Sequence, residues 1–209
     1  TIRACISIIF LNWIRTLKLL DLLGKLIIDS NSFSRMLKRI SHEILEKNSG
    51  PQKLVLIGLH TRGVPIANRI AKFIRDFEGL DVPVAQLDVS FYRDDTETKI
   101  KTNINPTIIE ININDCIVIL VDDVLYTGRS IRAAMDALMD YGRPSSIQLS
   151  VLIDRGHREL PISPDYIGKN IPTSRDEKIN VLVSEIDGSD GVEIEWKIKA
   201  NLWKISISC

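Results

Sequence analysis

Short apolar runs alternate along the chain with segments whose apolar residues recur at helical spacing. Runs of strand length and composition predict strands at 54–58, 84–89, 117–121, 147–153 and 179–184. Helical spacing with start and stop signals predicts helices at 32–47, 64–77 and 130–141. The unbroken hydrophobicity of several of the runs is typical of strands buried on both faces of a parallel sheet. We therefore predict an α/β fold with a mainly parallel sheet, in which a ligand binds at the carboxyl ends of the strands.

The predicted helix at 32–47 separates an apolar stripe from a basic one. Ser32 is expected to cap its amino-terminal end, and Gly50 and Pro51 to stop it. Spacing alone makes the basic stripe an ordinary solvated surface. The apolar stripe consists of Phe33, Met36, Leu37, Ile40 and Ile44, and the basic stripe of Arg35, Lys38, Arg39 and His42.

Three parts of the chain lack this alternation. Residues 92–112 are polar over a length that is uncommon for an inert loop, so we expect a mobile functional segment. Residues 4–14 are apolar but too short to span a membrane, because a spanning helix needs roughly 20 apolar residues. The chain begins with Thr1, so we expect that it is trimmed or that its true start lies elsewhere. Residues 1–24 are expected to be an extension, with a docking helix or a targeting segment as alternatives, and 196–209 to be a tail.

Composition excludes some classes of protein. The 209 residues include 27 Lys and Arg against 27 Asp and Glu, which gives a net charge of zero. That balance argues against a protein that relies mainly on non-specific attraction to phosphates, although it leaves room for a local basic patch. The three cysteines have no metal-ligand spacing and cannot all pair, which favours a reduced, cytoplasmic location.

The richest chemistry follows the apolar run at 117–121. Asp122 and Asp123 come directly after this run, where ionised carboxylates are costly unless something pairs with them. Thr127, Gly128 and Ser130 then precede a helix, and the free N–H groups of a helix start, together with two hydroxyls, suit a phosphate. Carboxylates for sugar hydroxyls beside a cradle for a phosphate predict a phosphoribose site. The other common phosphate motifs, G-x-x-x-x-G-K-[ST] and G-x-G-x-x-G, are absent from the sequence.

Residues 118–130, VILVDDVLYTGRS, resemble the phosphoribosyl pyrophosphate (PRPP) signature of type I phosphoribosyltransferases. Longer stretches resemble one family, PyrR, whose members are bifunctional pyrimidine operon attenuators and uracil phosphoribosyltransferases. The matching stretches are LHTRGVPIANRIA (59–71), LDVSFYRDD (87–95), RAAMDALMDYGRPSSIQLSVLIDRGHRELP (132–161) and DYIGKNIPTSRDEKINV (165–181). The resemblance implies a type I phosphoribosyltransferase domain at 25–195, with a mainly parallel sheet flanked by helices, a small hood and a flexible flap loop.

The resemblance also implies the reaction, in which uracil and PRPP form UMP and diphosphate. It gives Mg²⁺ as a cofactor bound through PRPP and not directly by the protein. The catalytic residues that it implies are Asp122 and Asp123, which hold the ribose, and Arg62 and Arg93, which meet the diphosphate; Arg93 does so when the flap closes. The implied PRPP and nucleotide contacts are Thr61, Arg62, Arg93, Asp122, Asp123, Val124, Leu125, Tyr126, Thr127, Gly128, Arg129 and Ser130.

Uracil is expected to bind near the carboxyl-terminal part of the domain. By resemblance, Tyr166 stacks on the base, Ile167 contacts its edge through the main chain, and Arg155 is a further substrate contact. The alternative for Tyr166 is a place in the core. His60 stands where relatives are expected to carry Lys, a departure that weakens the positive field beside Thr61 and Arg62.

PyrR proteins also bind a hairpin in the leader mRNA of pyrimidine operons when UMP is present, which implies RNA as a second partner. The implied RNA-binding residues are Lys38, Arg39, His42, His157, Arg158 and Lys169. Lys38 replaces a common Thr and Ser163 a common basic residue, so two other hypotheses stay open: a uracil phosphoribosyltransferase without RNA binding, and an RNA-binding UMP sensor with negligible turnover. A homodimer or larger homo-oligomer, with no membrane partner, completes the expectation.

Overall fold

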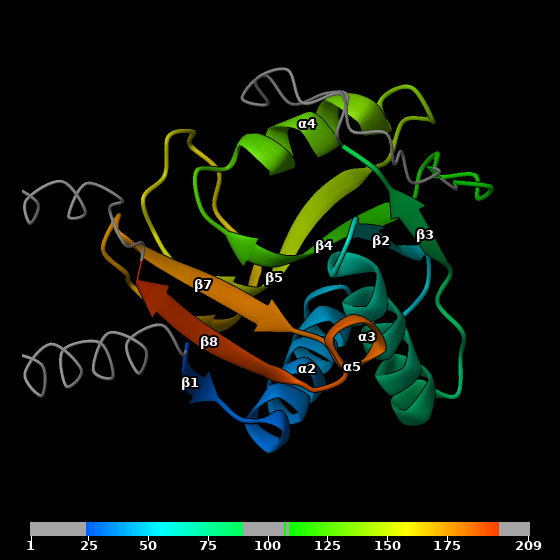
Figure 1. The fold of residues 1–209 in the computed structure, drawn as a ribbon. Helices are drawn as coiled ribbons and strands as arrows, with labels where there is room; N and C mark the ends of the chain where they lie inside the picture. The colour runs from blue at the N-terminus through cyan, green and yellow to red at the C-terminus, as the bar shows by residue number, and fades with distance from the viewer. Residues whose placement is uncertain (1–23, 90–106, 108, 197–209) are drawn as a thin grey trace, which may run out of the picture.

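A computed structural model describes residues 24–89, 107 and 109–196, and these contain two sheets. Figure 1 shows the larger sheet between one helix on one face and two helices on the other, with a smaller sheet in front of it. The helices are α2 (Ser30–Lys47), α3 (Gly63–Glu78), α4 (Arg129–Leu138) and α5 (Ser184–Asp187). The strands are β1 (Lys25–Ile28), β2 (Leu54–Leu59), β3 (Val84–Leu87), β4 (Ile117–Leu125), β5 (Ser146–Asp154), β6 (Tyr166–Asn170), β7 (Glu177–Leu182) and β8 (Gly191–Trp196).

The larger sheet has the order β3-β2-β4-β5-β6, and all of its strand pairs are parallel. Successive side chains of its central strands enter two different cores. In β4, Val118 and Leu120 pack with the buried face of α4, whereas Ile119 and Val121 pack with α2 and α3. This burial on both faces explains the unbroken apolar runs, and it confirms the predicted α/β fold.

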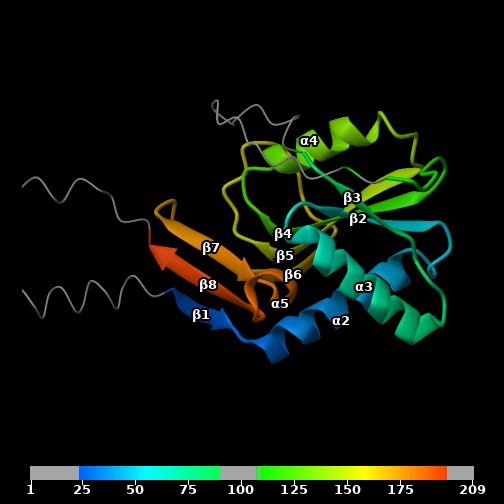
Figure 2. The same ribbon diagram turned by 45° about the vertical axis from the view of Figure 1, so that its right-hand side comes forward.

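The smaller sheet has the order β1-β8-β7 and is antiparallel. Figure 2 shows it beside α2 and α3, with the short helix α5 between its strands and α3. Its buried residues Val181 and Val192 belong to the same core as the α2 and α3 side chains. This sheet is the hood that the resemblance implied, and its β1 and β8 were not predicted from the sequence.

Several predicted boundaries are corrected. The residues at 179–184 do not extend the parallel sheet, because 177–182 form β7 of the hood and Ser184 begins α5. The fifth parallel strand is β6. It was not predicted, because its five residues form a short and partly polar segment that does not resemble a buried apolar run. Asp29, not Ser32, caps α2, and its carboxylate accepts a hydrogen bond from the Ser32 N–H at 2.7 Å. Lys47 ends that helix as predicted.

Candidate active site

β4 carries the two carboxylates beyond the point where its apolar run ends. The strand continues through Asp122 and Asp123 to Leu125, and Val124 and Leu125 remain paired with β5. Asp122 Oδ1 accepts a hydrogen bond from the Asp123 N–H at 2.9 Å, and Asp123 Oδ1 accepts one from the Val124 N–H at 2.8 Å. The acids therefore stand on a paired strand that continues beyond the apolar run predicted at 117–121.

Burial controls the charge of Asp123. Removal from water raises the pKa of this carboxyl group, while backbone hydrogen bonds and the nearby Arg62 guanidinium oppose the rise. A partly desolvated carboxylate gains more from binding hydroxyl groups or facing a developing positive charge than one in water does. Asp123 therefore has the electrostatic setting expected of a ribose-binding acid.

The turn from β4 into α4 forms an anion cradle. Gly128 caps α4 with a φ of 92°, a left-handed conformation that favours glycine, and a side chain there would approach Ile162 Cδ1 at 3.3 Å. Thr127 Oγ1 accepts a long hydrogen bond from the Arg129 N–H at 3.4 Å. The helix start thus lies within a few residues of both carboxylates, as the sequence predicted, and its dipole favours an anion.

The connection from β5 to β6 borders this cradle. The Thr127 carbonyl accepts hydrogen bonds from the Glu159 N–H at 3.0 Å and the Leu160 N–H at 3.3 Å. Arg129 directs its Nε to the Glu159 carboxylate at 2.8 Å. Through these contacts, the β5–β6 connection holds the conformation of the turn between β4 and α4.

The residues between β2 and α3 face the same end of the sheet. Gly63 begins α3 so close to β4 that a Cβ atom would lie 2.3 Å from the Val121 carbonyl oxygen, which places Arg62 beside the strand that bears the carboxylates. The Asp187 hydrogen bonds raise the pKa of Arg62, burial lowers it, and the Asp187 and Asp123 charges raise it further. Thr61 is exposed in this connection, and the buried Nε2 of His60 has no hydrogen-bond partner among the described residues.

Arg62 also contacts a residue that the sequence did not suggest. Its guanidinium donates to Asp187 of α5, with Nε 3.1 Å from Oδ2 and Nη2 2.7 Å from Oδ1. The only signal for Asp187 was its place in an acidic hood segment, SEIDGSD, which carries no recognisable motif. Arg93 lies outside the described residues, as does most of the segment 92–112 that was predicted to be mobile. Residues 109–112 of that segment are described, and Ile109 and Ile111 pack against the core that contains α4.

The predicted base contacts do not come together. Tyr166 begins β6 at the amino-terminal end of the strand, is 2% exposed, and hydrogen-bonds through its hydroxyl to Gln148 at 2.6 Å and Asn48 at 3.0 Å. The prediction that its ring stacks on the base is wrong, because the ring is in the core and away from the carboxyl ends of the strands. The Ile167 carbonyl is also engaged, since it accepts a hydrogen bond from Arg39 Nη2 at 2.8 Å.

Arg155 follows β5 at the correct end of the sheet but is buried. Its guanidinium lies 4.0 Å from the centre of the Tyr126 ring and donates to Thr173 Oγ1 at 3.0 Å and the Glu177 carbonyl at 2.8 Å. These contacts attach the β4–α4 turn to the segment that enters the hood. A direct contact between Arg155 and substrate remains a prediction.

The predicted RNA-binding residues divide into two groups. Lys38, Arg39 and His42 lie on α2, and Lys169 lines a cavity of about 370 Å³ together with Arg39. His157 and Arg158 lie in the β5–β6 connection, where Arg158 donates to the Tyr126 carbonyl at 2.9 Å and to Asp154 at 2.6 Å. Arg39, Arg158 and His157 therefore contact carbonyl groups of the protein's own backbone, although Arg39 and His157 are exposed. His42 is exposed and stacks on Phe77, and Lys38 and Lys169 are exposed.

Neither metal clusters nor spanning helices occur in the described part of the chain. No group of three or more His, Cys, Asp or Glu side chains there is arranged to hold a metal ion. Within the same residues, no helix is both long and apolar enough to cross a membrane.

Comparison with known proteins places the chain in a family. A family model described as the phosphoribosyl transferase domain matches residues 27–185. The Bifunctional protein PyrR of Clostridioides difficile (strain 630) is 55% identical over 173 residues, which are 81% of this chain and 96% of that protein. The protein of the same name from Thermus aquaticus is 56% identical over 161 residues, which are 77% of this chain and 89% of that protein.

Solved structures support the fold at lower identity. A hypoxanthine phosphoribosyltransferase from Staphylococcus aureus superposes with a TM-score of 0.62 at 21% identity, covering 85% of this chain and 94% of that one. At that identity the likeness concerns the fold alone. The match of the family model to most of the chain and the relatives at 55–56% identity show that the chain belongs to the PyrR family of phosphoribosyl transferase domain proteins.

Proposed function

We propose that the protein is a uracil phosphoribosyltransferase that also regulates pyrimidine operon transcription by binding leader mRNA when UMP is present. One observation carries the enzymatic part: β4 brings Asp122 and Asp123 to the sheet edge and turns directly into the cradle at the start of α4. A ribose with a phosphate on its 5-carbon fits that spacing of acids and N–H groups. The membership of the PyrR family selects uracil as the base and leader mRNA as the second partner.

The reaction breaks the bond between C1 of the ribose and the diphosphate oxygen and forms a bond from C1 to a uracil nitrogen, which loses its proton. Diphosphate leaves with the electron pair of the broken bond, so C1 becomes positively charged in the transition state. Asp122 and Asp123 hold the ribose hydroxyls, and the Asp123 charge faces the developing cation. The residues from Thr127 to Ser130 bind the 5-phosphate, and Arg62 binds the leaving diphosphate.

Mg²⁺ would neutralise the diphosphate as it leaves. We propose that oxygens of PRPP hold the ion, because Mg²⁺ in such sites is bound mainly by substrate phosphates and water. Arg93 of the predicted flap would add a second guanidinium to the diphosphate when the flap closes.

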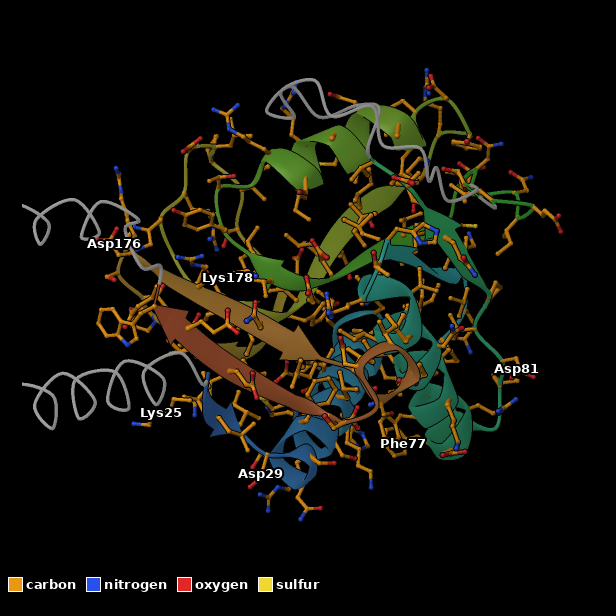
Figure 3. All side chains as sticks on the ribbon, viewed as in Figure 1. Lys25, Asp29, Phe77, Asp81, Asp176 and Lys178 are labelled. Atoms are coloured by element: carbon orange, nitrogen blue, oxygen red, sulfur yellow. The ribbon has the colours of Figure 1, made fainter. Side chains whose placement is uncertain are left out.

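The enzymatic proposal is tested by UMP formation from uracil, PRPP and Mg²⁺. Asp123→Asn should lower kcat/KM by roughly 100-fold or more, because it removes the charge that faces the oxocarbenium-like C1. Asp81→Asn is the matched control, since Asp81, labelled in Figure 3, lies exposed in the connection from α3 to β3. Absence of turnover in the wild type, with UMP still bound, would favour the sensor hypothesis. Absence of both would refute the phosphoribose site.

The regulatory proposal is supported by three exposed basic residues. Lys38 and His42 lie on α2, and Lys169 lies on β6. Binding of pyrimidine-operon leader RNA should tighten on adding UMP, and Lys169→Ala should weaken it and flatten its dependence on salt. Glu195→Gln on the hood is a control for changes in general charge. UMP formation without any RNA binding would leave a plain uracil phosphoribosyltransferase. We also propose a homodimer or larger homo-oligomer, which sedimentation would test.

A further inference from the structure

The structure joins the Arg62 connection to the hood through one ion pair. Arg62 precedes α3, Asp187 ends α5, and the two side chains meet through two hydrogen bonds of 3.1 and 2.7 Å. Two parallel contacts from a guanidinium are the geometry that Arg also uses toward phosphate oxygens. The Arg62 guanidinium, which we propose binds the diphosphate, is therefore already bound to the Asp187 carboxylate through the same two-point geometry.

The Arg62–Asp187 pair is not what holds the hood in place. Arg69 on α3 contacts Asp190 through two hydrogen bonds of 2.9 Å and Glu185 through its Nε at 2.8 Å. Asp187 itself accepts a hydrogen bond from the Val183 N–H at 2.9 Å, which closes the turn of α5. Release of Arg62 would thus leave α5 attached to α3, beside which it lies in Figures 1 and 2.

The pair is also open to exchange. The side chain of Arg62 is 34% exposed and that of Asp187 is 18% exposed, so water and a competing anion reach them. Partly exposed ion pairs contribute little stability, and a single carboxylate offers less negative charge than a diphosphate does. Arg62 lies close enough to Asp123 to feel its charge, which places it at the reacting end of the site.

We propose that Asp187 holds Arg62 in the ligand-free enzyme and that the diphosphate group of PRPP must take Arg62 away from it. The inference rests on the proposed transferase function. Asp187 is then a positioning residue that lowers affinity for PRPP, and it is neither a contact of the base nor a support of the fold. Its effect is expressed through Arg62 alone.

The test compares Asp187→Asn with Glu185→Gln in the full chain. An asparagine still accepts the Val183 N–H but lacks the charge that competes for Arg62. Asp187→Asn should lower KM for PRPP roughly two- to fivefold, with kcat and the KM for uracil unchanged, since a partly exposed pair contributes that much. Glu185→Gln loses a partner of Arg69 instead and should leave KM for PRPP unaltered. A substitution that merely loosened the structure would raise KM.

Titration with inorganic diphosphate and Mg²⁺ gives a second readout that does not require turnover. Asp187→Asn should bind diphosphate more tightly by the same factor, and the gain should vanish in an Arg62→Gln background. Unchanged or weaker diphosphate binding, or a gain that persists without Arg62, would overturn the inference. If the wild type forms no UMP but the substitution tightens diphosphate binding through Arg62, the transferase proposal fails and the competition for Arg62 stands.

Discussion

Substitution of Tyr166 tests whether its ring belongs to the core or to the binding site for the base. Its hydroxyl donates to Gln148 at 2.6 Å and accepts from Asn48 at 3.0 Å, inside a region where the side chain is 2% exposed. Gln148 and Asn48 remain hydrogen-bonded to each other at 3.1 Å when the hydroxyl is removed, so neither loses every partner. Tyr166→Phe should therefore cost about 1 kcal/mol of unfolding free energy.

That cost is measurable by heat and by pH. For a domain of this size it corresponds to a melting temperature lower by roughly 2–4 °C. Burial raises the pKa of Tyr166 to about 12 from its ordinary value of 10.0, so the folded protein keeps a proton that the unfolded chain loses between these values. Wild-type stability consequently falls as pH rises from 10 toward 12. The Phe variant lacks this loss, so the stability difference between the two proteins should shrink and then reverse in sign, because two pKa units correspond to about 2.7 kcal/mol, more than the cost of the lost hydrogen bond.

Tyr166→Leu separates a core role from a base-stacking role, because it removes the ring. It should cost roughly 3–5 kcal/mol of stability, as deletion of a buried ring does, while KM for uracil measured below the melting range stays within about twofold of wild type. Denaturant unfolding and uracil saturation curves provide both numbers. A Leu variant as stable as wild type, with KM for uracil raised tenfold or more, would refute this reasoning and return Tyr166 to the base site.

Two further changes address the strand that bears the carboxylates. Gly63→Ala would place a Cβ 2.3 Å from the Val121 carbonyl oxygen, so α3 and Arg62 must shift. We expect the free energy of unfolding, measured with denaturant, to fall by about 1–3 kcal/mol and the rate of UMP formation to fall roughly 100-fold. An unaltered rate would show that the position of Arg62 is unimportant. Burial raises the pKa of Asp123, so the folded state binds this proton more tightly than the unfolded chain, and stability falls as pH rises through the interval between the ordinary and the raised pKa. Asp123→Asn should remove this fall and unfold at higher denaturant concentration than wild type at neutral pH, whereas equal midpoints across the pH range would contradict the pKa direction.

The sequence predicted the parts of the fold whose signal is local. β2 and the first half of β4 are buried on both faces, so their apolar composition alone predicts a strand, without information on which strands pair with them. β6 exposes Lys169 and Asn170 and is defined mainly by its pairing with β5, a long-range contact that no local pattern contains. Asp29 caps α2 in place of Ser32, because its carboxylate lies three residues before Ser32 and accepts a hydrogen bond from the Ser32 N–H.

The site was predictable to a similar degree. Asp122, Asp123 and Gly128 lie in one continuous motif, so one stretch of sequence places them together. Asp187 is 125 residues from Arg62, and only the packing of α5 against α3 brings the two side chains into contact. Tyr166 was misassigned because an aromatic residue near a carboxyl-terminal motif has the same sequence pattern whether its ring faces a ligand or the core.

The continuation of β4 past its acids has a consequence for how substrate binding would appear in hydrogen–deuterium exchange. Val124 and Leu125 are paired with Ile153 and Asp154, so the backbone that carries the carboxylates is part of the central ladder. Amides in such a ladder exchange only when the whole domain opens. Ligand binding should therefore slow exchange at 118–121 by the same factor as in the centre of β2, since both report global stability. A substrate-specific exchange signal is to be expected instead at Asp123 and Val124, whose N–H groups donate to the carboxylates proposed to hold the ribose, and at the amides after Tyr126, where β4 has ended.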